Sequence, residues 1–136
     1  MKTILVVDDS VTMRKSIQMS LELSGFQVTL AADGAEALEK LQAGLRPDML
    51  LTDIMMPRMD GLSLIREARK LLRFTPIVAL TTQGQREMRD RAKLAGATAW
   101  MIKPVGGLEL ARILAEHLGV VLPEPGQAPG PTPNAG

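Results

Sequence analysis

Five polar residues, each directly after a short and largely apolar run, form the part of this sequence that could do chemistry. They are the adjacent acids Asp8 and Asp9, a third acid Asp53, the hydroxyl residue Thr81 and the cation Lys103. The runs before them are residues 4–7, 49–52, 77–80 and 98–102. If these runs are parallel strands, all five side chains emerge at one edge of one sheet, where open α/β folds bind ligands. Three carboxylates facing one ammonium group, with a hydroxyl nearby, suit a divalent cation and a phosphoryl group.

The types of these residues narrow the choice of cation. Carboxylates this close together repel, so such a site holds a cation or keeps one carboxyl protonated. No His or Cys lies near them in the sequence, so every ligand would be oxygen, which favours Mg²⁺ or Mn²⁺ over Zn²⁺. Taken singly, adjacent acids usually mean a helix N-cap or a solvated turn, and a lysine just past a strand is more often on the surface. The agreement of four strand ends favours a site.

An alternation of strands and helices must position these residues. The predicted strands are 3–7, 26–30, 48–52, 76–80 and 98–102, and the predicted helices are about 11–24, 35–43, 62–72, 86–95 and 107–118. Near-continuous apolar strands are typical of a sheet covered on both faces, and the alternating pattern of 26–30 suits an edge strand. Gly25, Gly44 and Gly96 are predicted to end the first, second and fourth helices. Short connections between the elements predict right-handed crossovers and a parallel sheet.

Composition excludes several classes of protein. The 136 residues suffice for one domain, and a net charge of +1 gives no argument for nucleic acid or membrane binding. No cysteine is present, which excludes thiol catalysis and disulfides, and three aromatic residues are too few for base stacking. No run approaches the roughly 20 apolar residues of a membrane span, and the N-terminus does not resemble a signal peptide, so we expect a cytoplasmic protein.

The C-terminal segment differs from the rest of the chain. From Pro123 onward proline and glycine dominate and no periodic apolar pattern remains. We therefore predict a domain over residues 1–120 and a disordered Pro/Gly-rich tail over 121–136. After the fifth helix we expect no room for a DNA-binding or catalytic output domain.

Over residues 2–119 the chain resembles the receiver domain of bacterial two-component response regulators, in particular the stand-alone kind related to the chemotaxis regulator. The resemblance rests on the segments 6–10 (VVDDS), 53–61 (DIMMPRMDG), 81–82 (TT) and 103–104 (KP), in this order and at these separations. It implies a flavodoxin-like, doubly wound α/β fold with five helices and a five-stranded parallel sheet. The strand order 2-1-3-4-5 is taken from the family.

The resemblance also implies a role for each acid. Asp53 would be the phosphoacceptor, receiving a phosphoryl group from the phosphohistidine of a histidine kinase. Asp9, Asp53 and the backbone carbonyl of Met55 would bind Mg²⁺ directly, with Asp8 acting through water. Phosphoryl transfer needs mainly in-line positioning and charge neutralisation, which agrees with this division of roles.

The remaining residues would sense the phosphoryl group and transmit its presence. Lys103 and Thr81 would contact its oxygens, and Trp100 stands at the family's switch aromatic position. The face made by the fourth helix, fifth strand and fifth helix, which includes the cationic segment 85–93, would then bind a target protein. Such a protein is a signalling phosphoacceptor with weak autophosphatase activity at most, and not an enzyme in the usual sense.

Some positions depart from the family pattern. Trp100 replaces the usual Tyr or Phe, Thr82 stands where a small residue is common, and Val105 stands where many members have Phe. A cis bond before Pro104 could turn the lysine inward. These departures keep open a degenerate receiver that acts as a phosphate sink or a phosphorylation-independent interaction module. Two enzyme classes fit less well: a haloacid-dehalogenase-type phosphatase needs an Asp-x-Asp at the first strand, and a flavodoxin needs a glycine-containing phosphate loop.

Overall fold

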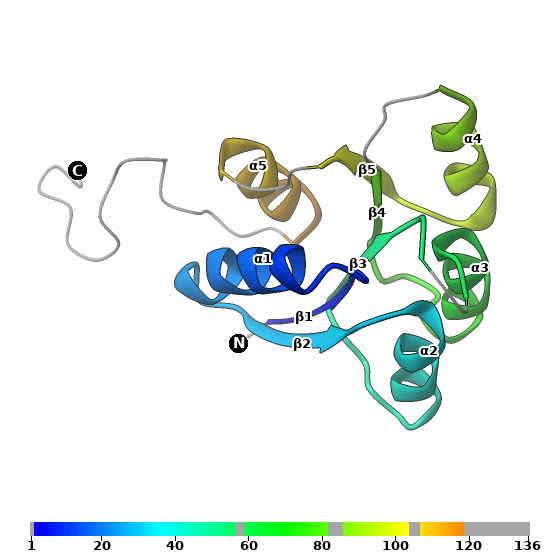
Figure 1. The fold of residues 1–136 in the computed structure, drawn as a ribbon, viewed down its shortest axis with the longest axis horizontal. Helices are drawn as coiled ribbons and strands as arrows, with labels where there is room; N and C mark the ends of the chain where they lie inside the picture. Colours follow the sequence, from blue (N-terminus) through cyan, green and yellow to red (C-terminus); the bar gives the residue numbers. More distant parts are fainter. Residues whose placement is uncertain (1, 57–58, 82–85, 104–106, 119–136) are drawn as a thin grey trace, which may run out of the picture.

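The computed structural model describes residues 2–56, 59–81, 86–103 and 107–118, and these form a parallel sheet with helices on both faces (Figure 1). The strands are β1 (Thr3–Val7), β2 (Gln27–Ala31), β3 (Met49–Asp53), β4 (Ile77–Thr81) and β5 (Ala99–Ile102). They lie in the order β2-β1-β3-β4-β5, and all four pairings are parallel. This order and the α/β class are as predicted, with β2 at an edge of the sheet.

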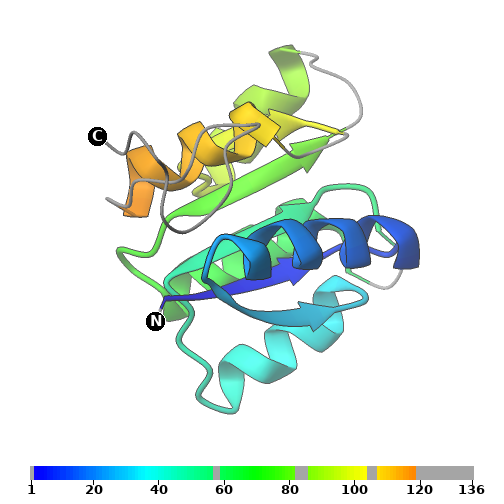
Figure 2. The ribbon, with the colours of Figure 1, turned by 90° about the vertical axis from the view of Figure 1, so that its left-hand side faces the viewer.

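Within the described residues, five helices connect and cover the strands. They are α1 (Val11–Leu23), α2 (Gly34–Gln42), α3 (Gly61–Leu71), α4 (Arg86–Ala95) and α5 (Gly107–Leu118). Helices α1 and α5 lie on one face of the sheet and α2, α3 and α4 on the other, as Figures 1 and 2 show. No helix among the described residues is both long and apolar enough to cross a membrane.

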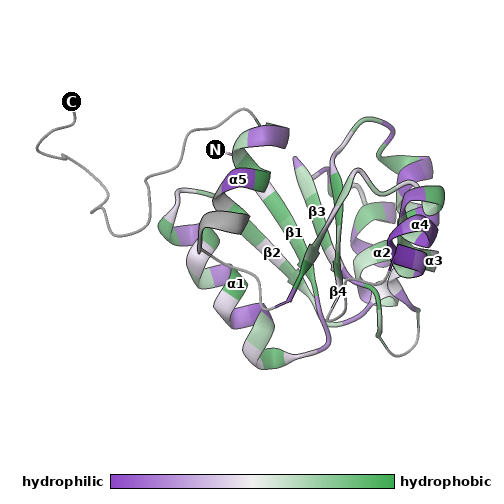
Figure 3. Ribbon diagram, turned by 90° about the horizontal axis from the view of Figure 1, so that it is seen from above, coloured by the Kyte–Doolittle hydropathy of each residue, from purple (hydrophilic) through white to green (hydrophobic). Residues whose placement is uncertain are grey.

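The two faces of the sheet carry separate hydrophobic cores because successive strand residues point to opposite sides. In β1, Leu5 and Val7 pack toward α2, α3 and α4, whereas Ile4 and Val6 pack toward α1 and α5. The apolar strands therefore run through the centre of the molecule, between helices that turn their polar residues outward (Figure 3). This double burial explains why the first, third and fourth strands are almost uninterrupted apolar runs.

The predicted boundaries differ from the observed ones by one residue in four strands, and β5 differs only at its start, which is Ala99 and not residue 98. β2, β3 and β4 each begin and end one residue later than predicted, so Asp53 and Thr81 are the last residues of their strands and do not follow them. The glycine predictions are confirmed, since Gly25, Gly44 and Gly96 have φ angles of +94°, +114° and +118°. Phe26 precedes β2 and is buried in the core on the α1 side. The predicted tail over 121–136 lies outside the described residues.

Candidate functional site

The three predicted acids meet at the carboxyl ends of β1 and β3. These strands are neighbours, with Val7 paired to Thr52, so the residues that follow each strand end lie side by side. One carboxylate oxygen from each of Asp8, Asp9 and Asp53 lies within 4.8 Å of the others. Asp8 and Asp53 are buried and Asp9 is exposed, which opens the cluster to solvent on one side.

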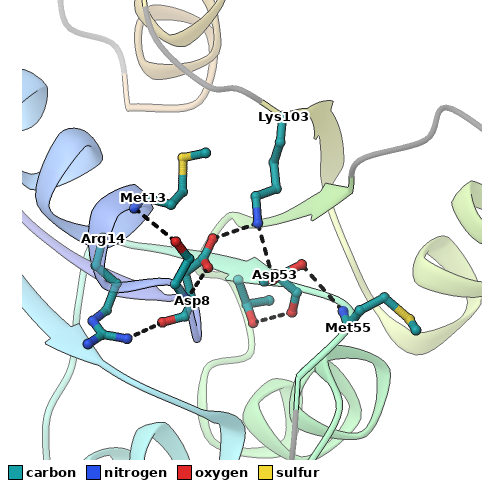
Figure 4. A network of polar contacts seen from close by, with 8 residues as sticks. Asp8, Met13, Arg14, Asp53, Met55 and Lys103 are labelled. Atoms are coloured by element: carbon teal, nitrogen blue, oxygen red, sulfur yellow. Dashed lines mark hydrogen bonds and ion pairs between the residues drawn. The ribbon is translucent and has the colours of Figure 1, made fainter.

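The turn after β1 fixes Asp8 by backbone contacts. Its N–H donates to the carbonyl of Ala31 at 3.2 Å, and its Oδ1 accepts from the N–H of Ser10 at 2.9 Å. Ser10 in turn caps α1 by accepting from the N–H of Met13. Arg14 donates to the carbonyl of Asp8 at 2.6 Å, a contact that sequence reasoning did not predict (Figure 4). The alternative interpretation of these acids as helix N-caps is wrong for α1, because Ser10 is the N-cap residue of that helix.

Asp53 is fixed by its neighbours in the loop after β3. The N–H of Met55 donates to Asp53 Oδ1 at 3.3 Å, and the hydroxyl of Thr52 donates to the Asp53 carbonyl at 2.9 Å. The start of α3 packs directly against this turn, where the N–H of Gly61 donates to the carbonyl of Ile54 at 2.8 Å. A Cβ at Gly61 would overlap the Asp53 carbonyl oxygen and approach Ile54 Cα to 2.6 Å, so only glycine fits.

Lys103 reaches across the sheet edge from the end of β5. Its ammonium Nζ lies 2.9 Å from Asp8 Oδ2 and 3.2 Å from Asp53 Oδ2, and its side chain is 11% exposed (Figure 4). Its backbone N–H donates to the carbonyl of Thr81 at 2.7 Å, which fixes the point from which the side chain starts. The lysine therefore turns inward, as its predicted role requires. Pro104, Val105 and Thr82 lie outside the described residues.

The electrostatics of the site follow from burial and from these contacts. Burial raises the pKa of the Asp53 carboxyl, and the Asp8 charge acts in the same direction, whereas Lys103 opposes both. Burial alone would lower the pKa of Lys103, but its hydrogen bonds and charge interactions with Asp8 and Asp53 raise it. One ammonium group does not balance three carboxylates, so the site attracts a further cation.

The residues present fit a hard divalent cation. All three acids offer carboxylate oxygen, and oxygens bound to Mg²⁺ at about 2.0–2.1 Å lie about 3 to 4 Å from one another. Among the described residues, the buried Asp8 Oδ2 is balanced by the Lys103 ammonium at 2.9 Å, and the same ammonium is shared with Asp53. The predicted fourth ligand, Met55, lies in the loop just after Asp53, with its side chain 71% exposed.

The two predicted switch residues lie on the neighbouring strands β4 and β5. Thr81 ends β4 and is 8% exposed, and its register partner on β5 is Ile102. Trp100 is half-buried on β5, and the guanidinium carbon of Arg89 in α4 lies 4.5 Å from the centroid of its ring. Sequence reasoning identified 85–93 as a cationic segment but did not predict this stacking, because residues eleven apart carry no local pattern.

Comparison with known sequences identifies the family. The sequence model of the response regulator receiver domain matches residues 4–115. This chain belongs to the receiver domain family. Receiver domains are signalling phosphoacceptors that interact with histidine kinases and with downstream targets, and they bind Mg²⁺ at an acidic pocket.

Particular relatives add detail. Response regulator MprA of Mycobacterium ulcerans is 44% identical over 107 residues, which are 79% of this chain and 46% of that protein. The chain thus spans about half the length of the curated relatives it matches. Among solved structures, chemotaxis protein CheY4 of Vibrio cholerae superimposes with a TM-score of 0.81 at 37% identity, over 86% of this chain and 98% of that one.

A further structure bears on the metal. The receiver domain of sensor histidine kinase PA1611 from Pseudomonas aeruginosa superimposes with a TM-score of 0.79 at 34% identity, over 88% of this chain and 98% of that one. That structure has a magnesium ion coordinated in its active site cleft. The acidic cluster of this receiver domain offers the same kind of ion three carboxylates.

Proposed function

We propose that this receiver domain accepts a phosphoryl group on Asp53 from the phosphohistidine of a histidine kinase. The observation that carries the proposal is the ion-paired contact of Lys103 with Asp8 and Asp53 beside a third acid, Asp9. A carboxylate oxygen of Asp53 would form the new P–O bond while the P–N bond breaks, and the electron pair of that bond would leave on the imidazole nitrogen. The product is an acyl phosphate, a labile mixed anhydride that water removes slowly, so the domain would act as a switch and not as a turnover enzyme.

The neighbouring residues would each have one task. Asp9, Asp53 and the Met55 carbonyl would hold Mg²⁺, with Asp8 acting through water, and the bound ion would neutralise phosphoryl oxygens during transfer. Lys103 is a compact charge on a long stem, able to leave its carboxylates for a phosphoryl oxygen. The Thr81 hydroxyl would donate to another of these oxygens.

The signal would pass to a target protein over the face of α4, β5 and α5, with Trp100 as the moving side chain. We place the protein in the cytoplasm, as one step of a phosphorelay such as a chemotaxis system. Neither nucleic acid nor membrane is a partner in this proposal.

Labelling with a small phosphodonor tests the proposal. Incubation with acetyl phosphate and Mg²⁺ should add one base-labile phosphoryl group, seen by intact mass, and Asp53→Asn should abolish the addition. Asp60→Asn is the matched control: Asp60 caps α3 by accepting from the N–H of Ser63 at 2.8 Å, and asparagine caps equally well. Labelling that survives in Asp53→Asn, or proceeds in EDTA at the same rate, would contradict the proposal.

The stacking of Arg89 on Trp100 favours a second candidate, a receiver that binds its partner without phosphorylation. A cation stacked on an indole ring restrains the movement of that ring. Indole is also bulkier than the Tyr or Phe side chain that usually stands at the switch position. Partner affinity that is equal with and without beryllofluoride, a phosphoryl mimic, would favour this candidate. A clear difference in affinity would favour the switch.

A further inference from the structure

Two of the three acids in the cluster are fixed by contacts of their own carboxylates, and the third is not. Asp8 and Asp53 both face the Lys103 ammonium, and each also accepts a backbone N–H on its Oδ1. Among the described residues, no hydrogen bond or ion pair reaches the carboxylate of Asp9, which is exposed. The position of that carboxylate therefore depends on the backbone of the turn that carries it.

The side chain of Arg14 fixes the backbone of this turn. Its Nη1 donates to the carbonyl of Asp8 at 2.6 Å, a short contact for a charged donor. The Asp8 carbonyl and the Asp9 N–H belong to one planar peptide group, so a donor that holds the oxygen also holds the direction in which Asp9 leaves the strand end. Figure 4 shows that Arg14 reaches the backbone of Asp8, whereas Lys103 reaches its carboxylate.

Helix α1 holds Arg14 in place. The residue is half-buried near the start of the helix, and its N–H donates to the carbonyl of Ser10, the N-cap residue, at 2.9 Å. The N–H of Ser10 donates in turn to Asp8 Oδ1 at 2.9 Å. The start of α1 and the turn after β1 are therefore joined by a closed set of hydrogen bonds, and a rigid element presents the guanidinium to the carbonyl.

Two properties of Arg14 would act on a bound cation in opposite directions. As a positive charge beside the acidic cluster it repels Mg²⁺, so loss of the charge alone would strengthen Mg²⁺ binding. As a donor that orients an acid of the cluster it favours binding, and partners of this kind change metal affinity by about 10–100-fold. The sign of the change in an Arg14 variant therefore shows which property dominates.

We propose that Arg14 is a positioning residue for the metal, which holds the Asp9 carboxylate in the cluster through the peptide group between Asp8 and Asp9. It touches neither the ion nor the phosphoryl group. The proposal rests on the function proposed above, since it needs Asp9 as a ligand of Mg²⁺. Positioning by Arg14 outweighs the repulsion from its charge, so a variant without the donor binds Mg²⁺ more weakly.

Calorimetric titration with Mg²⁺ alone, without a phosphodonor, tests the proposal. Arg14→Met removes the donor and the charge, and it should weaken Mg²⁺ binding about tenfold. Lys15→Met is the matched control, because it removes the same charge from the next residue, which is exposed, and it should change the affinity by less than about twofold. Arg14→Lys should recover part of the affinity, since an ammonium group is also a charged donor but lacks the planar fork.

A double-mutant cycle shows whether Arg14 acts through Asp9. Asp9→Asn keeps an oxygen ligand but loses the negative charge, so this protein should bind Mg²⁺ more weakly. Once Asp9 is changed, Arg14→Met should alter the affinity by less than about twofold, because the carboxylate that it positions is gone. Urea titration in EDTA establishes that each variant is folded. Should Arg14→Met not fold, Arg14→Gln replaces it in both experiments, with the same direction expected.

Three results would overturn the proposal. They are an Mg²⁺ affinity that is unchanged or higher in Arg14→Met, an equal loss in Lys15→Met, and an equal loss from Arg14→Met with and without Asp9→Asn.

Acetyl phosphate labelling separates this proposal from the preceding one. At saturating Mg²⁺ the Arg14→Met protein should label on Asp53 as the unmodified protein does, and only the Mg²⁺ concentration for half-maximal labelling should rise. If no protein labels while the Mg²⁺ affinities follow the expected pattern, the phosphoacceptor role alone is refuted.

Discussion

Helices α3 and α4 lie side by side on the same face of the sheet, yet they are held to it by different means. α3 buries Leu64, Ile65 and Ala68 along one face. The buried residues of α4 are two alanines, Ala92 and Ala95. Since burying a leucine or isoleucine contributes about 1.5–3 kcal/mol and an alanine much less, the core anchors α3 firmly and α4 weakly. The firm helix supports the acidic cluster, and the weakly anchored one lines the surface proposed for partners.

Polar contacts replace part of the missing core on the α4 side. At the amino edge of the sheet, Arg69 of α3 donates to the carbonyl of Gly96, in the turn between α4 and β5, at 2.7 Å. At the carboxyl edge, Lys103 connects the end of β5 to Asp8 and Asp53. The α3 side of the molecule is therefore held mainly by apolar packing. The α4–β5 side is connected to it at both edges of the sheet by the long cationic side chains of Arg69 and Lys103.

The largest effect is expected where α3 meets the acidic turn. Gly61→Ala places a methyl group against the backbone of Asp53 and Ile54, which cannot yield as a flexible side chain would. We expect a loss of more than about 3 kcal/mol in the free energy of unfolding, measured by urea titration. Gly44→Ala is the control, because its Cβ would meet open space and only its φ of +114° is strained, at about 1–2 kcal/mol. Equal losses in the two variants would mean that α3 does not depend on this close approach.

The second largest effect is expected for Arg69, which connects α3 to the turn between α4 and β5 at the amino edge of the sheet. Arg69 donates to the carbonyls of Gly96, Leu72 and Thr75 at 2.7–2.8 Å, and Arg69→Met would leave these acceptors without that donor. We expect a loss of about 2–3 kcal/mol, again by urea titration, because several partly buried acceptors lose a charged partner together. Arg66→Met, one turn earlier on the exposed face of α3, should cost less than about 0.5 kcal/mol. A small loss for Arg69→Met would show that apolar packing alone holds the α4 side.

The contrast between apolar packing and the contacts of long cationic side chains also explains which features could be predicted from the sequence. The strand order came from the family, but the apolar runs and the three capping glycines indicated the elements because each pattern is local. The convergence of Asp8, Asp53 and Lys103 was predictable because parallel strands end at one edge. The contacts of Arg69, Arg14 and Arg89 were not, since a long side chain can reach many acceptors and nothing in its sequence neighbourhood selects one. The contacts of these three arginines therefore had to be seen in the structure.

The third largest effect is expected for Lys103, which connects the end of β5 to Asp8 and Asp53 at the carboxyl edge of the sheet. Lys103→Met removes the ammonium that faces Asp8 and Asp53 and leaves two carboxylates, both largely buried, without it. In buffer with EDTA we expect a loss of about 2 kcal/mol by urea titration, below the usual cost of breaking a fully buried pair because the cluster opens to solvent. Lys93→Met, an exposed lysine of α4, should change stability by less than about 0.5 kcal/mol. A gain in stability for Lys103→Met would mean that burying the Lys103 ammonium destabilises the fold by more than its ion pairs stabilise it.

The smallest effect is expected in the hydrogen exchange of the α3 and α4 amides of the unmodified protein. Local opening requires less free energy where few apolar side chains are buried, so amides of α4 should exchange with solvent deuterium sooner than those of α3. A difference of about 1.4 kcal/mol in opening free energy would appear as a tenfold difference in protection. In Arg69→Met the protection of α4 should fall further than that of α3, because the tie at Gly96 is lost while Leu64 and Ile65 remain buried. Equal protection of the two helices would mean that the alanine-based contact of α4 holds as firmly as the leucine-based contact of α3, and the proposed partner surface would then be as rigid as the phosphorylation site.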